Sequence, residues 1–187
     1  LAPVEAEAQR KDLALALVRQ AERLGTALHP ITRHSVAGLV RSMNSYYSNL
    51  IEGHRTMPRD IDAALSRHFT GNSAQRSLQR QHLAHMEVQA DMEVRLKGMS
   101  SGDTCSAEFL CWLHEGFYRR LPEEFHKVED QKGNVHKVQP GKLRDGEVSV
   151  GRHLAPSRAQ LGEFLNRFAA FYGSLVTTEP ASLLAAA

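Results

Sequence analysis

The amino-acid sequence predicts a mainly α-helical fold, a helical bundle with one short β-hairpin. Apolar residues recur every three or four positions in six segments, and this spacing gives a helix one apolar face. Proline and glycine stand near the ends of these segments, where helices begin and stop. Residues 128–150 differ, because valines occur there around the turn pairs Pro140-Gly141 and Asp145-Gly146. That pattern is typical of a β-hairpin.

The first predicted helix lies within residues 1–30. It begins near Val4, loosens near Gly25 and ends before His29-Pro30. Its apolar face consists of Leu13, Leu17, Ala21, Leu24 and Leu28. We expect this face to pack in a core, as amphipathic helices of globular proteins usually do. The N-terminal helix (1–30) is separated in this way from a domain that covers residues 31–187.

The second predicted helix, residues 35–53, ends at Gly53. Glycine readily adopts the left-handed conformation that closes a helix, so Gly53 is predicted to cap this one. The helix carries one apolar stripe, made of Val36, Leu39, Val40, Met43, Tyr47, Leu50 and Ile51.

Four further helices are predicted from their apolar faces and boundary residues. They run from Pro58 to about Gly71, from Ser73 to Gly98, from about Thr104 to Pro122 and from Pro156 to Gly173. Gly173 is predicted to cap the last of them.

The composition is that of a globular protein. Of the 187 residues 42% are hydrophobic, and 23 basic against 21 acidic residues give a net charge of +2. The basic residues are interspersed with acidic ones, so neither a nucleic acid nor a membrane surface is expected as a partner. No segment approaches the roughly 20 apolar residues of a membrane span. We expect a cytoplasmic protein.

Two polar residues near the end of the second helix could carry a function. Ser48 and Glu52 are four residues apart, so they share one face of the helix. The helix dipole disfavours a carboxylate at this end, and the carboxylate gains if an arginine approaches it. The simpler interpretation is a serine and a glutamate that are merely exposed to solvent.

The string Ser48-x-x-x-Glu52-Gly53 resembles the inhibitory motif (S/T)xxxE(G/N) of the Fic (filamentation induced by cAMP) family. About 90 residues further on, a second segment resembles the flap of the same family. The flap residues that carry this resemblance include Lys142, Leu143, Arg144, Val148, Val150 and Gly151. The two motifs occur in the order that Fic proteins with an N-terminal inhibitory helix show.

The resemblance implies a protein adenylyltransferase that moves AMP from ATP, with Mg²⁺, onto a Ser, Thr or Tyr hydroxyl of a target protein. In the family, a His-Pro-Phe-x-x-Gly-Asn-(Gly/Asp)-Arg-x-x-Arg motif carries the catalysis. The inhibitory glutamate pairs with the last arginine and prevents productive binding of the γ-phosphate of ATP. The resemblance therefore assigns autoinhibition to Glu52, with Ser48 and Gly53 in the same motif, and target binding to the flap.

The chain contains no complete catalytic motif of this kind. The nearest string, His68-Phe69-Thr70-Gly71-Asn72, lacks the proline and precedes the flap. We therefore assign no catalytic residue and expect a chain truncated before the catalytic motif. As it stands it is expected to be inactive and to bind ATP and Mg²⁺ only weakly.

Other interpretations stay open. The chain could be a non-catalytic helical module that binds an extended peptide at the edge of the flap, and the family resemblance leaves a homodimer open. His82, His85 and Glu87 could bring metal ligands to one helix face, although a solvated face is the simpler interpretation. His114 and Glu115 are expected to face solvent.

Overall fold

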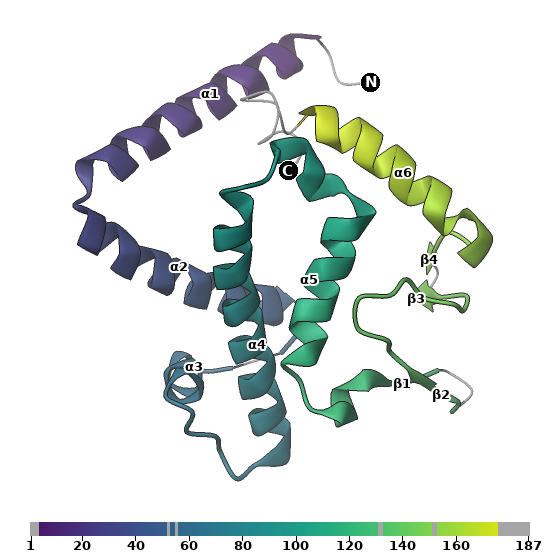
Figure 1. Ribbon diagram of the computed structural model, residues 1–187. Coiled ribbons are helices and arrows are strands. Elements are labelled where there is room, and N and C mark those ends of the chain that lie inside the picture. Colours follow the sequence, from purple (N-terminus) through teal and green to yellow (C-terminus); the bar gives the residue numbers. More distant parts are fainter. Residues whose placement is uncertain (1–3, 52, 55, 131–132, 151–152, 176–187) are drawn as a thin grey trace. The chain divides into compact units, whose positions relative to one another are not determined.

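The computed structural model describes residues 4–51, 53–54, 56–130, 133–150 and 153–175. This part of the chain is mainly helical with short antiparallel strands, which confirms the predicted fold class (Figure 1). The helices are α1 (Val4–Ala27), α2 (Pro30–Ile51), α3 (Pro58–Leu65), α4 (Ser73–Leu96), η1 (Ser101–Cys105), α5 (Ala107–Arg119), η2 (Glu123–His126) and α6 (Arg158–Leu175), of which η1 and η2 are 3₁₀ helices. The strands are β1 (Lys127–Glu129), β2 (Val135–Lys137), β3 (Ser149–Val150) and β4 (His153–Leu154).

The chain forms two compact units, which we describe separately. Unit 1 comprises Leu1–His34, Gly98–Leu110 and Asp145–Ala187, and unit 2 comprises Ser35–Lys97 and Cys111–Arg144. Unit 2 therefore contains the C-terminal part of α2 and the segment that carries Lys142.

Unit 2 is built around α4. Helix α3 packs against α4, and α5 lies beside α4 with Gly116 next to Val88 (Figure 1). The apolar residues buried in this unit are Ile61, Ala64, Leu83, Ala84, Met86, Val88 and Leu121. Removing these side chains from water is the main force that holds the three helices together.

A buried glutamine fixes α3 and the loop after it to α4. The side chain of Gln79 is 2% exposed. Its Nε2 donates to the carbonyl oxygen of Asp60 at 3.0 Å, and its Oε1 accepts from the backbone N–H of Thr70 at 2.9 Å. Both ends of the buried amide are thus hydrogen-bonded, as burial of a polar group requires.

Helices α2 and α3 end in the same way but with different residues. After α2, the N–H of Gly53 donates to Leu50 and the N–H of His54 donates to Asn49, a Schellman motif in which Gly53 has φ +81°. After α3, Arg67 takes the equivalent position with φ 59°. The predicted cap at Gly53 is confirmed, whereas Arg67 adopts a left-handed conformation that a side chain disfavours.

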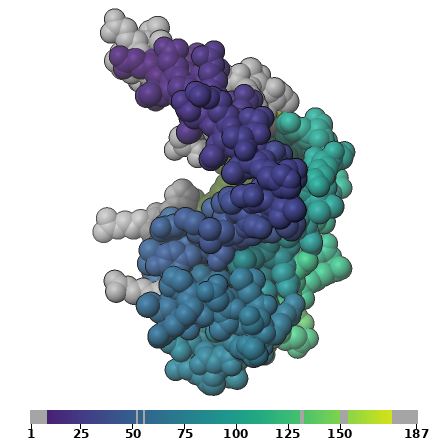
Figure 2. Space-filling model, turned by 90° about the vertical axis from the view of Figure 1, so that its left-hand side faces the viewer, coloured from purple at the N-terminus to yellow at the C-terminus, as the bar shows by residue number. Residues whose placement is uncertain are grey.

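The apolar faces of α1 and α2 are exposed, so the prediction that α1 is a core helix is wrong. On α1, Leu13 is 71% exposed and Leu24 is 64% exposed. On α2, the stripe from Val36 to Ile51 is exposed by 39% or more at each of its residues, and Figure 2 shows α2 at the surface. Periodicity shows that a helix has an apolar face, but it does not show what covers that face.

The hairpin within residues 128–150 forms at a different turn from the predicted one. Strands β1 and β2 pair antiparallel with Val128 opposite His136. Asp130 organises the turn between them, because its carboxylate accepts from the backbone N–H of Asn134 at 2.9 Å and from the Asn134 amide at 3.0 Å. A second, shorter pairing joins β3 and β4, with Ser149 opposite Leu154.

In unit 1, α6 packs against η1. Gly173 lies inside α6 and does not cap it, contrary to prediction. A Cβ at this position would lie 3.3 Å from the carbonyl oxygen of Gly102. The glycine therefore serves close packing of the two elements.

The left-handed conformation of Arg67 leads to a stability prediction. Arg67→Gly and Arg67→Ala both remove the side chain, but only glycine fits the backbone without strain. We expect the Gly variant to be about 1 kcal/mol more stable than the Ala variant in urea unfolding. Gly53→Ala, the matched control, should lower stability by about 1 kcal/mol. Equal stabilities of the two Arg67 variants would contradict the prediction.

Candidate functional site

The C-terminal turns of α2 carry the described part of the predicted inhibitory motif. Ser48 is exposed in the last two turns of the helix, and Gly53 closes it. Glu52 lies outside the described residues. Glu52 follows Ile51, the last residue of α2, and precedes Gly53 in the sequence.

A buried polar contact attaches this end of α2 to α4. Ser45 on α2 and His82 on α4 are both 0% exposed. The Ser45 hydroxyl lies 2.8 Å from His82 Nδ1. The Asn49 amide nitrogen donates to the carbonyl oxygen of Ser45 at 2.9 Å and lies 3.4 Å from the same imidazole nitrogen. One histidine of α4 thus meets two successive turns of α2.

The geometry favours one tautomer of His82. The Asn49 amide has a second hydrogen to direct at Nδ1, and the Ser45 hydroxyl can donate to the same nitrogen. With Nδ1 as the acceptor the proton is on Nε2, which is buried without a hydrogen-bond partner among the described residues. Burial, together with the nearby His85 and His54, lowers the pKa of His82 from 6.5 to about 4. The imidazole is neutral at physiological pH.

Helix α4 does not present the solvated histidine face that we expected. His82 is buried, and His85 is half-buried with its Nε2 2.9 Å from the side-chain nitrogen of Gln89. In the described part of the chain, no group of three or more His, Cys, Asp or Glu side chains could hold a metal ion. Sequence reasoning missed the role of His82, although its place on the apolar side of α4, between Leu78 and Met86, was a signal of burial.

The segment that carries Lys142 is a tight turn docked on α5. The N–H of Lys142 donates to Gln139 at 3.1 Å, with Pro140 and Gly141 between them and Gly141 at φ +75°. This is the turn that a Pro-Gly pair favours. The N–H of Gly141 donates to His114 Nδ1 at 3.0 Å, and a Cβ on Gly141 would lie 3.0 Å from the Cβ of Glu115.

His114 and Glu115 therefore form the surface on which this turn rests, and they do not simply face solvent. Burial lowers the pKa of His114, which keeps Nδ1 free to accept from Gly141. Beyond the turn, Lys142 is exposed, Leu143 is 47% exposed and Arg144 is half-buried.

The remaining predicted flap residues belong to unit 1. The carbonyl oxygen of Val148 accepts from the N–H of Ala155 at 3.2 Å and extends the β3–β4 pairing, and Val150 is in β3. Gly151 lies outside the described residues. An open groove of about 780 Å³ runs along these strands and the first turns of α6, lined by Val148, Leu154 and Phe164 among others.

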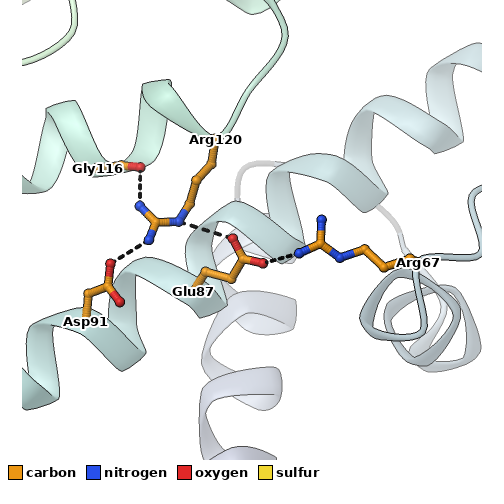
Figure 3. Close-up of polar contacts among 5 residues, drawn as sticks. All are labelled: Arg67, Glu87, Asp91, Gly116 and Arg120. Carbon is orange, nitrogen blue, oxygen red and sulfur yellow. Dashed lines mark hydrogen bonds and ion pairs between the residues drawn. The ribbon is translucent and has the colours of Figure 1, made fainter.

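A cluster of charges joins three helices of unit 2 (Figure 3). Arg120 donates to Glu87 at 3.1 Å, to Asp91 and to the carbonyl oxygen of Gly116 at 2.7 Å. The second oxygen of Glu87 accepts from Arg67 at 2.9 Å. The adjoining cleft of about 380 Å³ is lined by both arginines and Glu87. Because the two guanidinium groups are already paired with carboxylates, this cluster serves to hold the helices together.

No family model, curated protein or solved structure matches this chain. None of the helices in the described part of the chain is both long and apolar enough to cross a membrane.

The lowered pKa of His82 predicts a loss of stability in acid. In the unfolded chain His82 takes up a proton with the ordinary pKa of 6.5, whereas in the folded chain its pKa is about 4. The contribution of His82 to the free energy of unfolding is therefore fully present above about pH 6.5, and it is lost as the pH falls towards 4. Between about pH 7 and pH 4.5, wild type should lose roughly 2 kcal/mol more than His82→Asn in denaturant unfolding. Equal losses in the two proteins would show that His82 is not buried as a neutral group.

Proposed function

We propose that this chain is the regulatory part of a Fic-type protein AMP-transferase, in which Glu52 holds the enzyme inactive. The complete protein would transfer AMP from ATP to a Ser, Thr or Tyr hydroxyl of a target protein. The observation that carries the proposal is the position of the Ser48-x-x-x-Glu52-Gly53 string, which spans the C-terminal end of α2 and its Schellman cap. Family resemblance supplies the reaction and the inhibitory role of Glu52, and the described residues on either side of Glu52 are the last residue of α2 and its glycine cap.

The physical basis of the inhibition is charge competition. The C-terminal end of a helix carries partial negative charge, so a carboxylate beside it is unfavourable until a cation approaches. An arginine that binds the γ-phosphate of ATP is such a cation. While it pairs with Glu52 it is not available to the phosphate, so ATP is not held in the productive position.

In this proposal the nucleotide and Mg²⁺ are not held mainly by the described residues. Among them, no cluster of acidic or histidine side chains could hold a metal ion, and Arg67 and Arg120 are neutralised by Glu87 and Asp91. In this proposal the nucleotide and the metal bind to the catalytic motif, which the sequence does not contain. The residues of this chain regulate that site and hold the target.

We place the protein in the cytoplasm, where ATP is available and where the free thiols of Cys105 and Cys111 stay reduced. Its partner in this proposal is a target protein, held at the turn that bears Lys142, Leu143 and Arg144 and at Val148 and Val150. Self-association as a homodimer is compatible with the exposed apolar stripe of α2.

The regulatory claim is tested with Glu52→Gly in the protein encoded by the whole gene. Self-modification with ATP labelled at the α-phosphate should rise at least about tenfold, because the phosphate-binding arginine is set free. Glu52→Gln is the matched control for charge and should also raise transfer, whereas Glu52→Asp should leave it low. No rise with Gly or Gln would refute the proposal, as would a coding sequence without the catalytic motif.

A second candidate function is the binding of an extended peptide by the chain on its own. The groove beside β3 and β4 favours it, because Leu154 is 80% exposed and Phe164 is 53% exposed. A short strand with an apolar border can accept a peptide by strand addition.

This second function predicts that peptides selected from a random library bind the isolated chain. The Val148→Asp substitution should weaken their binding. A buried charge in the groove should lower affinity about tenfold in fluorescence anisotropy. Val135→Asp places the same charge on the other hairpin and should have no effect. If no peptide is selected, or if both variants bind equally, the groove is not a peptide site.

A further inference from the structure

The way in which α2 is held in unit 2 is unusual for an amphipathic helix. Its apolar stripe is exposed, with Met43 46% exposed and Tyr47 54% exposed. Burial of apolar surface therefore contributes little to holding the C-terminal half of α2. Polar contacts with α4 hold it instead.

Among the described residues, Arg41, Ser45 and Asn49 of α2 make polar contacts with α4, and these contacts differ in environment. Arg41 pairs with Glu93 at 2.8 Å, but the Glu93 side chain is 49% exposed. Exposed ion pairs contribute little and are weakened by salt. The Ser45–His82 contact is fully buried and lies one turn before Ser48, so it is the stronger restraint on the helix end.

The same contact is incompletely satisfied. Nδ1 of His82 faces Ser45 and Asn49, while the Nε2 side is buried without a partner among the described residues. The cost of burying Nε2 without a partner offsets part of the stability that the hydrogen bond between Ser45 and His82 contributes. The contact therefore holds α2 less firmly than a fully satisfied buried hydrogen bond would.

We propose that His82 is a positioning residue for regulation, which holds the C-terminal turns of α2 against α4 through Ser45 and so keeps the inhibitory segment in place. The inference rests on the proposed function of Glu52. Loss of the Ser45–His82 contact loosens the end of α2 from α4, and the turns that precede Glu52 in the sequence are then held less firmly. His82 acts through α2 and touches neither nucleotide nor target.

The anchor is tested first by amide hydrogen exchange in this chain, without any enzymatic assay. Ser45→Ala and His82→Leu remove one partner each, and residues 46–51 should exchange on the order of tenfold faster in both. His82→Asn keeps an acceptor for the Ser45 hydroxyl and should restore most of the protection. His85→Asn, on the neighbouring turn of α4, is the control and should leave α2 unchanged.

The exchange pattern separates anchoring from general destabilisation. Residues 74–90 of α4 should keep their protection in Ser45→Ala, because Ser45 lies on α2 and takes no part in the backbone hydrogen bonds within α4. If residues 46–51 exchange at the wild-type rate in Ser45→Ala and His82→Leu, the anchor is refuted. If α4 loses protection to the same extent as α2, His82 stabilises unit 2 as a whole and does not specifically anchor α2. That result also overturns the proposal.

The regulatory consequence is tested by AMP transfer in the protein encoded by the whole gene. Ser45→Ala should raise basal transfer by a fraction of the Glu52→Gly increase, whereas a merely structural role would lower transfer. A rise with Glu52→Gly and none with Ser45→Ala overturns the inference and leaves the proposed function standing. No rise with either variant refutes the proposed function, and the positioning role fails with it.

Discussion

The buried contact between Ser45 and His82 is the restraint on which the arrangement of unit 2 around α2 depends. It joins a helix with an exposed apolar face to α4, which packs against α3 and contacts α5 at Gly116. A neutral imidazole is required, because a charged one would be buried without a carboxylate to balance it. The contact between the described end of α2 and α4 therefore depends on a neutral His82.

Helix α4 can serve as a scaffold because its other contacts are well satisfied. Gln79 uses both ends of its amide, and Glu87 accepts from Arg67 and Arg120, so α3, α4 and α5 are tied to one another by core packing and by charge. On this base the end of α2 is attached to α4 and the Pro140-Gly141 turn to α5. Within unit 2, the end of α2 with Ser48 and the turn with Lys142 are thus both attached to this set of helices.

Local chemistry made part of this structure predictable. The cap at Gly53, the start of α3 at Pro58 and the Pro140-Gly141 turn depend on backbone preferences of single residues, which the sequence states directly. The exposure of the α2 stripe, the burial of His82 and the choice of Asp130–Asn134 as the hairpin turn depend on partners distant in sequence or on side-chain bonds. Arg67 could not be foreseen at a left-handed position, because nothing in an arginine side chain favours that conformation.

Nitrogen-15 NMR of the His82 imidazole tests the central claim most directly, because it reports tautomer, charge and hydrogen bonding of the anchor itself. The account predicts a neutral ring at pH near 7 with the proton on Nε2 and a hydrogen-bonded, unprotonated Nδ1. Ser45→Ala should shift the Nδ1 signal and leave the ring neutral. An imidazolium, or an Nδ1 signal that does not respond to Ser45→Ala, would show that α2 is held by something other than this contact.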